Sequence, residues 1–213
     1  MDNEQNLEKA PISQDGKWKS IGKELLIFAL FAVGIVLPFR MYIAEPYLVD
    51  GRSMDPTFAT GDYLIVDKIS DRNGTPARNS VVIFNATNAG NPKTNFIKRI
   101  IGLPGETIIM NDNIVTIVNK EHPLGFNPDQ SYVTHFCEAT NCIKSFEKTL
   151  GNDEYFVMGD NRAESFDSRY WGPLSKQYVL GKPIVRLFGV QGWGRIPVPI
   201  VSKFSFLPGN DTK

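Results

Sequence analysis

An uncharged apolar run near the N-terminus constrains this chain more than any other feature of its sequence. Residues 25–39 read LLIFALFAVGIVLPF, 15 residues without a charge, and Arg40 follows directly. As a helix the run would be roughly 22 Å long, short of the ~30 Å hydrocarbon core of a bilayer unless Arg40 snorkels and residues 41–44 extend the span. The run therefore requires an apolar environment to receive it.

Three interpretations of this run compete. A helix in the core of a soluble domain would carry a polar stripe, and the run has none. A cleavable signal peptide would end in a small-x-small site, whereas Ala44 has Tyr42 two positions before it. We favour a retained transmembrane anchor over residues 25–44, preceded by a tail over residues 1–24 whose polar, mixed-charge composition is typical of a mobile segment.

The lysines around the run predict the orientation of the anchor. Lys17, Lys19 and Lys23 precede it, and only Arg40 follows closely. Because cytoplasmic flanks carry the excess of positive charge, we expect the N-terminus inside and residues 45–213 outside. The chain is thus predicted to be a single-pass protein of a cytoplasmic membrane, with membrane lipid as a partner.

The charge balance and the counts of ligand residues exclude other classes. Lys and Arg together number 23, as do Asp and Glu, so the chain lacks the positive field typical of proteins that bind nucleic acid. With only two cysteines and two histidines, a thiolate metal site or a catalytic zinc is improbable. We therefore predict no metal, no cofactor and no nucleic-acid partner.

Beyond residue 45 the chain alternates short apolar segments with turns, which predicts a mainly β fold with antiparallel strands. The predicted strands are 63–66, 81–84, 95–101, a hairpin of 107–110 with 114–118, 155–158 and 184–188. Segment 119–151 shows weak strand patterning, so we predict that it is a small inserted subdomain. The β core would then comprise residues 45–118 and 152–213.

Both cysteines fall in the predicted insertion. Cys137 and Cys142 are five positions apart and would face an oxidising exterior if the predicted topology is right. We predict a disulfide between them. Two free thiols are the alternative, because a sequence does not show whether the sulfur atoms can meet.

Two stretches carry residues that suggest catalysis. The first, residues 51–57, reads GRSMDPT, and an isolated serine such as Ser53 in a loop is usually only a turn former. The second, residues 95–106, places Lys98 on a predicted strand between Phe96 and Ile100 on the same face. Burial there would favour a neutral amine, which can act as the general base for a serine nucleophile. A lysine that merely snorkels from a strand is the alternative.

A third stretch, residues 159–172, is rich in Ser, Asp and Arg and could orient a catalytic group through hydrogen bonds. Together with Gly61–Lys68, these stretches resemble, in order, the bacterial type I signal peptidases, which are membrane-anchored serine proteases. The resemblance covers the whole chain. It implies a serine endopeptidase of the bacterial cytoplasmic membrane that cleaves signal peptides from exported preproteins after an Ala-x-Ala-like site.

The resemblance also implies roles for individual residues. Ser53 would be the nucleophile, Lys98 the general base and Ser165 the serine that orients the lysine. Supporting ion pairs would join Asp160 with Arg99 and Asp167 with Arg169. The residues that would line the substrate pockets are Tyr47, Val49, Met54, Phe58, Phe96 and Ile97.

One position departs from the family pattern. Some members have a serine hydroxyl two residues before the nucleophile as the second donor of the oxyanion hole, and this chain has Gly51 there. The second donor is then a water, the Arg52 region or another backbone N–H. The alternative function is a non-catalytic, membrane-tethered β domain that binds a partner through an edge strand, in which Ser53 and Lys98 would be replaceable.

Overall fold

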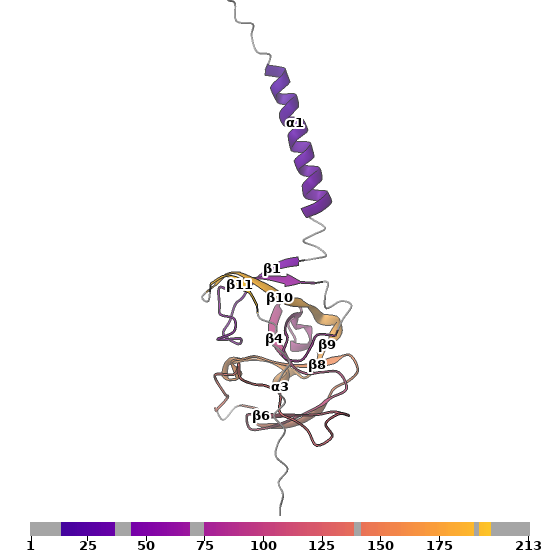
Figure 1. Ribbon diagram of the computed structural model, residues 1–213, viewed down its shortest axis with the longest axis vertical. Helices are drawn as coiled ribbons and strands as arrows, with labels where there is room; N and C mark the ends of the chain where they lie inside the picture. Colours follow the sequence, from indigo (N-terminus) through magenta and orange to yellow (C-terminus); the bar gives the residue numbers. More distant parts are fainter. Residues whose placement is uncertain (1–13, 37–43, 69–74, 139–141, 190–191, 197–213) are drawn as a thin grey trace, which may run out of the picture. The chain divides into compact units, whose positions relative to one another are not determined.

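The computed structural model of the chain describes residues 14–36, 44–68, 75–138, 142–189 and 192–196. The chain divides into two units, Met1–Tyr42 and Ile43–Lys213, which we describe separately. Figure 1 shows both, with the helix of the first unit in indigo.

The first unit contains helix α1, Gln14–Phe31, which continues as a π-helical turn, η1, Ala32–Val36. No proline lies between Pro11 and Pro38, and the intervening lysine, glutamate and leucine residues are good helix formers. Helix α1 therefore begins at Gln14, within the predicted tail of residues 1–24, and the mobility and the bounds of that tail stay a prediction.

The apolar side chains of α1 that the structure describes are exposed, among them Leu25, Phe28 and Leu30. No helix within the described ranges combines the length and the apolarity needed to cross a membrane. Residues 37–43 of the predicted anchor lie outside the described ranges. The anchor over residues 25–44 stays a prediction.

The second unit is built from antiparallel strands, which confirms the predicted mainly β fold. The strands are β1 Ala44–Leu48, β2 Tyr63–Asp67, β3 Val81–Asn85, β4 Asn95–Gly102, β5 Thr107–Asn111, β6 Ile114–Val118, β7 Ser145–Thr149, β8 Glu154–Met158, β9 Leu174–Ser175, β10 Val179–Phe188 and β11 Gly194–Arg195. Short helical turns are η2 Ala86–Ala89, η3 Arg162–Glu164, α3 Ser168–Trp171 and η4 Lys176–Tyr178.

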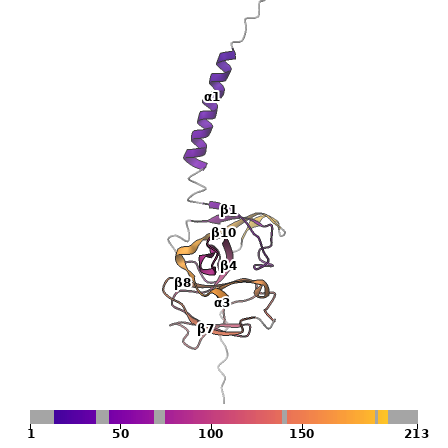
Figure 2. The same ribbon diagram turned by 180° about the vertical axis from the view of Figure 1, so that it is seen from behind.

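The strands form two sheets. The eight-stranded sheet has the order β1-β2-β10-β3-β4-β8-β9, with β11 on β10, and the three-stranded sheet has the order β6-β5-β7. In Figure 1, β1 and β6 lie at opposite ends of this unit, and the view from behind in Figure 2 places β7 at the same end as β6.

Every segment predicted as a strand is part of a strand, but the structure adds β1, β7 and the two-residue strands β9 and β11. β7 lies within segment 119–151 and pairs with β5 of the hairpin. Its sequence, SFEKT, is mostly exposed, so it lacks the apolar alternation by which a strand is recognised. The boundaries of the inserted subdomain stay a prediction.

Among the described residues, three buried clusters hold the unit together, and one of them lies under the turn that carries Ser53. This cluster contains Val49, Met54, Phe58, Leu64 and Val81, with Ile97 packed against it. Met54 and Phe58 are essentially inaccessible to solvent. Burying each such side chain contributes roughly 1.5–3 kcal/mol, so Met54 and Phe58 hold the turn against the sheet.

Candidate active site

Ser53 lies in the turn between β1 and β2. Gly51, two residues before it, has φ of +101°, a conformation that a residue with a Cβ adopts only under strain. Its N–H donates to Thr60 Oγ1 at 3.1 Å. The glycine and the buried Met54 together determine where the serine hydroxyl projects.

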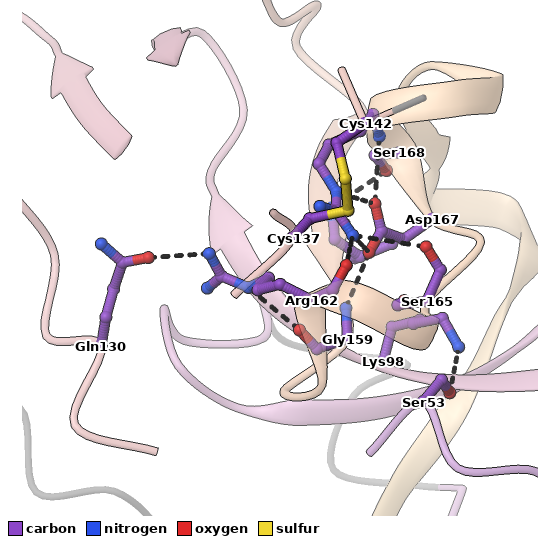
Figure 3. Close-up of polar contacts among 12 residues, drawn as sticks. Ser53, Lys98, Gln130, Cys137, Cys142, Gly159, Arg162, Ser165, Asp167 and Ser168 are labelled. Carbon is purple, nitrogen blue, oxygen red and sulfur yellow. Dashed lines mark hydrogen bonds and ion pairs between the residues drawn. A yellow bond between two sulfur atoms is a disulfide. The ribbon is translucent and has the colours of Figure 1, made fainter. Parts of the chain in front are cut away.

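Lys98 projects from β4 toward this turn. Its Nζ is 2.7 Å from Ser53 Oγ, in a hydrogen bond that Figure 3 shows, and it also donates to the Ile97 carbonyl at 3.1 Å. The side chain is almost completely buried, and its Nζ lies 5.3 Å from the centroid of the Phe96 ring. The predicted nucleophile and base are thus in direct contact.

Burial changes the acidity of the Lys98 amine. It lowers the pKa of Lys98 from 10.5 to about 8, because burial penalises the ammonium form. The nearby Asp167 and Asp160 carboxylates oppose this by raising the pKa, and Arg169 lowers it further. A neutral amine is therefore accessible near physiological pH.

Arg99, the next residue of β4, points to the other face and forms a buried pair with Asp160. Its Nε and Nη2 donate to the two Asp160 carboxylate oxygens at 2.8 and 2.5 Å. Thr57 Oγ1, from the turn that carries Ser53, donates to Asp160 Oδ2 at 2.5 Å. The Asn161 N–H donates to the Ser53 carbonyl at 3.1 Å. These contacts connect the turn to residues 160–161.

Asp167 makes hydrogen bonds to other residues of the loop that contains Asp160 and Asn161. Its carboxylate pairs with Arg169 Nε at 2.8 Å and accepts from the Gly159 N–H at 3.0 Å. It also caps the first turn of α3 through the Arg169 N–H. Both predicted ion pairs, Arg99 with Asp160 and Arg169 with Asp167, are therefore present in the structure.

Ser165 is placed differently from its predicted role. It is buried, but its Oγ has no hydrogen-bond partner within the described part of the chain, and it makes no hydrogen bond to Lys98. A Cβ at position 159 would collide with Ser165 Oγ and with the Ser53 carbonyl, so only glycine permits this approach. Its assignment as the base-orienting residue stays a prediction.

A groove of about 540 Å³ runs from Ser53 and Lys98 along the start of β4 and the end of β1. Of the predicted substrate-binding residues, the groove is lined by Tyr47, Val49, Phe96 and Ile97. Met54 and Phe58 lie instead in the cluster beneath the turn. Further lining comes from Lys93, Glu164 and Phe166, none of which the sequence pattern singled out.

The family model described as "Signal peptidase, peptidase S26" matches residues 22–188. The chain belongs to this family. Its membership makes it a hydrolase of the serine endopeptidase class, as the sequence predicted.

Curated relatives agree with the family. A probable signal peptidase I-2 of Synechocystis sp. is 34% identical over 179 residues, 83% of this chain and 76% of the relative. Signal peptidase I P of Bacillus subtilis subsp. natto is 38% identical over 152 residues, 70% of this chain and 76% of the relative. A crystal structure of a signal peptidase I from Enterococcus faecalis is 29% identical, covers 51% of this chain and 97% of its own, and has a TM-score of 0.42.

The cysteines and histidines of this chain lie in the region between β6 and β7. Cys137 and Cys142 form the predicted disulfide, with their Cα atoms 6.0 Å apart. His122 packs edge-on against Phe126, and His135 Nδ1 is hydrogen-bonded to Thr134 Oγ1. No group of three or more potential metal ligands occurs in the described ranges.

Sequence reasoning missed several residues that hold the site. Thr57 and Asn161 lie within the recognised stretches, but nothing in their spacing showed which backbone or carboxylate they would contact. Arg52 pairs with Glu164 at 3.0 Å, which joins the Ser53 turn to η3 beside the groove. Only the position of Arg52 next to Ser53 suggested that it has a role at the site. Its partner, Glu164, lies more than a hundred residues away in the sequence.

Proposed function

We propose that this chain is a membrane-anchored signal peptidase that uses Ser53 as nucleophile and Lys98 as general base. The observation that carries the proposal is the 2.7 Å contact between a buried lysine amine and a serine hydroxyl. A serine is a weak nucleophile until a base removes its proton, and a lysine serves as that base only when neutral. The lowered pKa of Lys98 supplies this condition.

The reaction proceeds in two half-reactions. Neutral Lys98 takes the Ser53 proton while Oγ attacks the scissile carbonyl, and the resulting ammonium then protonates the leaving amine as the peptide bond breaks. Lys98, neutral again, removes a proton from water, which attacks the acyl ester and releases the signal peptide with a free carboxylate. The proton on Lys98 returns to Ser53 Oγ, so the enzyme is restored.

The oxyanion formed in each step requires donors aimed at its oxygen. Resemblance to the family assigns the Ser53 backbone N–H as one donor. The Gly51 N–H is engaged by Thr60 Oγ1, which makes it a poor candidate for the second. A water, the Arg52 region or another backbone N–H remains for that role.

The other predicted residues have supporting roles in this proposal. The pairs Arg99 with Asp160 and Arg169 with Asp167 hold the loop that faces the nucleophile, and Ser165 orients Lys98 when its hydroxyl turns toward the amine. The groove residues Tyr47, Val49, Phe96 and Ile97 would contact an extended peptide. Their apolar side chains leave room for small residues before the scissile bond and favour an Ala-x-Ala-like site.

The proposal includes the membrane topology. Residues 25–44 would anchor the chain, with the N-terminus in the cytoplasm and the β unit outside, and the substrates would be preproteins whose signal peptides lie in the same membrane. The exposed apolar side chains of α1 support the anchor, because exposing so many of them to water is unfavourable. The lysines that precede the run support the orientation.

A substrate pair tests the proposed specificity. The full chain in detergent is expected to cleave a preprotein with Ala at the first and third positions before the scissile bond, leaving a single new N-terminus identified by mass spectrometry. Changing the residue directly before the bond from Ala to Phe should lower kcat/KM on the order of 100-fold, because an apolar pocket of fixed size rejects the larger side chain.

The matched control is an Ala to Phe change one position further from the bond. In an extended peptide this side chain points to the opposite side, so cleavage should change only a few-fold. Equal cleavage of both substituted preproteins, or cleavage at scattered positions, would contradict the proposed specificity.

A further inference from the structure

Residues 130–135, here called segment 130–135, contact the loop of residues 159–172 and the side chain of Arg99 from outside the groove. Gln130 Oε1 accepts a hydrogen bond of 2.8 Å from Arg162 Nη1, as Figure 3 shows. His135 forms an isolated parallel bridge with Asn161. Tyr132 lies over Arg99, whose Cζ is 4.0 Å from the ring centroid. Among the described residues that line the groove, none belongs to this segment.

The Tyr132 ring covers one face of the Arg99 guanidinium, whose Cζ lies 4.0 Å from the ring centroid. The guanidinium donates in its own plane to both Asp160 oxygens and, through Nη1, to the Asn79 carbonyl at 2.7 Å. A cation over an aromatic face is attracted by the negative face of the ring. The Tyr132 hydroxyl donates to Asn79 Oδ1 only at 3.4 Å, which is long for a hydrogen bond, so the ring makes the principal contact.

The Arg99–Asp160 pair is connected directly to the nucleophile. Asp160 is completely buried, and its neighbour Asn161 donates its backbone N–H to the Ser53 carbonyl. The Asn161 side chain donates to the Arg52 carbonyl at 3.2 Å. Any displacement of Asp160 is therefore passed through one peptide unit to the backbone of Ser53.

We propose that Tyr132 is a positioning residue for the reaction: its ring fixes the Arg99–Asp160 pair and thereby the backbone that holds Ser53 in line with its base. The inference rests on the proposed function, in which Ser53 is the nucleophile. Because Tyr132 acts on the serine and lies away from the groove, it affects the rate of the chemical step and leaves peptide binding unchanged. A displacement of about 1 Å at a reacting group can cost on the order of 100-fold in rate.

The test compares Tyr132→Phe with Tyr132→Leu in the full chain, assayed in detergent on one peptide substrate. Tyr132→Phe keeps the ring over Arg99 and should retain kcat within about twofold. Tyr132→Leu fills the space beside the neighbouring core cluster but has no flat face for the guanidinium, so kcat should fall about 10- to 100-fold while KM stays within about twofold. Phe136→Leu is the control, because Phe136 follows the segment closely and is 41% exposed.

Circular dichroism melting of each variant separates positioning from loss of folding. If Tyr132→Leu is unfolded at the assay temperature, Tyr132→Met, which adapts to irregular apolar space, takes its place with the same expectation. An unchanged kcat in the folded variant, a rise in KM alone, or an equal loss in Tyr132→Phe would overturn the proposal. Absence of cleavage by the wild-type chain would instead overturn the proposed function, and this inference with it.

Discussion

Replacing Ser53 by alanine should lower kcat/KM for a signal-peptide substrate by about 10⁴-fold or more. The substitution removes the only atom that would form the acyl bond, and the remaining donors and groove can supply only residual catalysis. Folding should be retained, because within the described ranges the side chain makes one hydrogen bond, to Lys98, and Lys98 keeps its bond to the Ile97 carbonyl.

Ser145→Ala is the matched control, since Ser145 begins the exposed strand β7. It should cleave at the wild-type rate. Melting curves recorded for both variants show whether either change unfolds the chain. A Ser53→Ala chain that folds and still cleaves within tenfold of wild type would show that another group is the nucleophile.

Lys98→Arg should be as inactive as Lys98→Ala, with a loss in kcat/KM on the order of 10³-fold or more. The guanidinium keeps the positive charge but does not release its proton in the range where proteins work, so it cannot accept the proton of Ser53. The larger planar group must also fit a position that is almost fully buried.

Two further variants make this result specific to proton transfer. Lys98→Met keeps an unbranched side chain, one atom shorter and without an amine, and should be equally inactive while remaining folded. Lys148→Arg, on exposed β7, should leave the activity unchanged. Near-normal turnover by Lys98→Arg would mean that the lysine contributes its charge and not proton transfer.

The strands that could be predicted are short apolar runs bounded by turn residues. β2 reads YLIVD and β3 reads VVIFN, and such a run is recognisable whether every second residue is buried, as in β2, or nearly every residue is buried, as in β3. β7 is mostly exposed, and β1 carries Pro46, a residue that argues against a strand in sequence and is accepted here at the edge of the sheet. These two strands are defined by their partners, which a local pattern does not contain.

The pairing of Ser53 with Lys98 was predictable because the stretches that carry these residues resemble, in order, those of a known family. The surroundings of the pair were not. Tyr132, which contacts Arg99, lies 33 positions after it in a region with weak strand patterning. Stacking of a ring on a guanidinium produces no periodic pattern in the sequence. Ser165 was predicted to contact Lys98, but a hydroxyl can point in several directions, and resemblance does not specify which one it takes.

The pH dependence of kcat/KM tests the central claim, a neutral lysine as general base, most directly. The acid limb reports the free-enzyme pKa of the base, and for Lys98 burial lowers this value to about 8, with Asp167 and Asp160 acting against the shift and Arg169 with it. Since only the deprotonated amine is active, kcat/KM should rise with pH and reach half of its plateau near pH 8, provided that melting curves show a folded enzyme throughout. A rate that does not change between about pH 6 and 9, or a midpoint near the ~6.5 of histidine, would contradict the account.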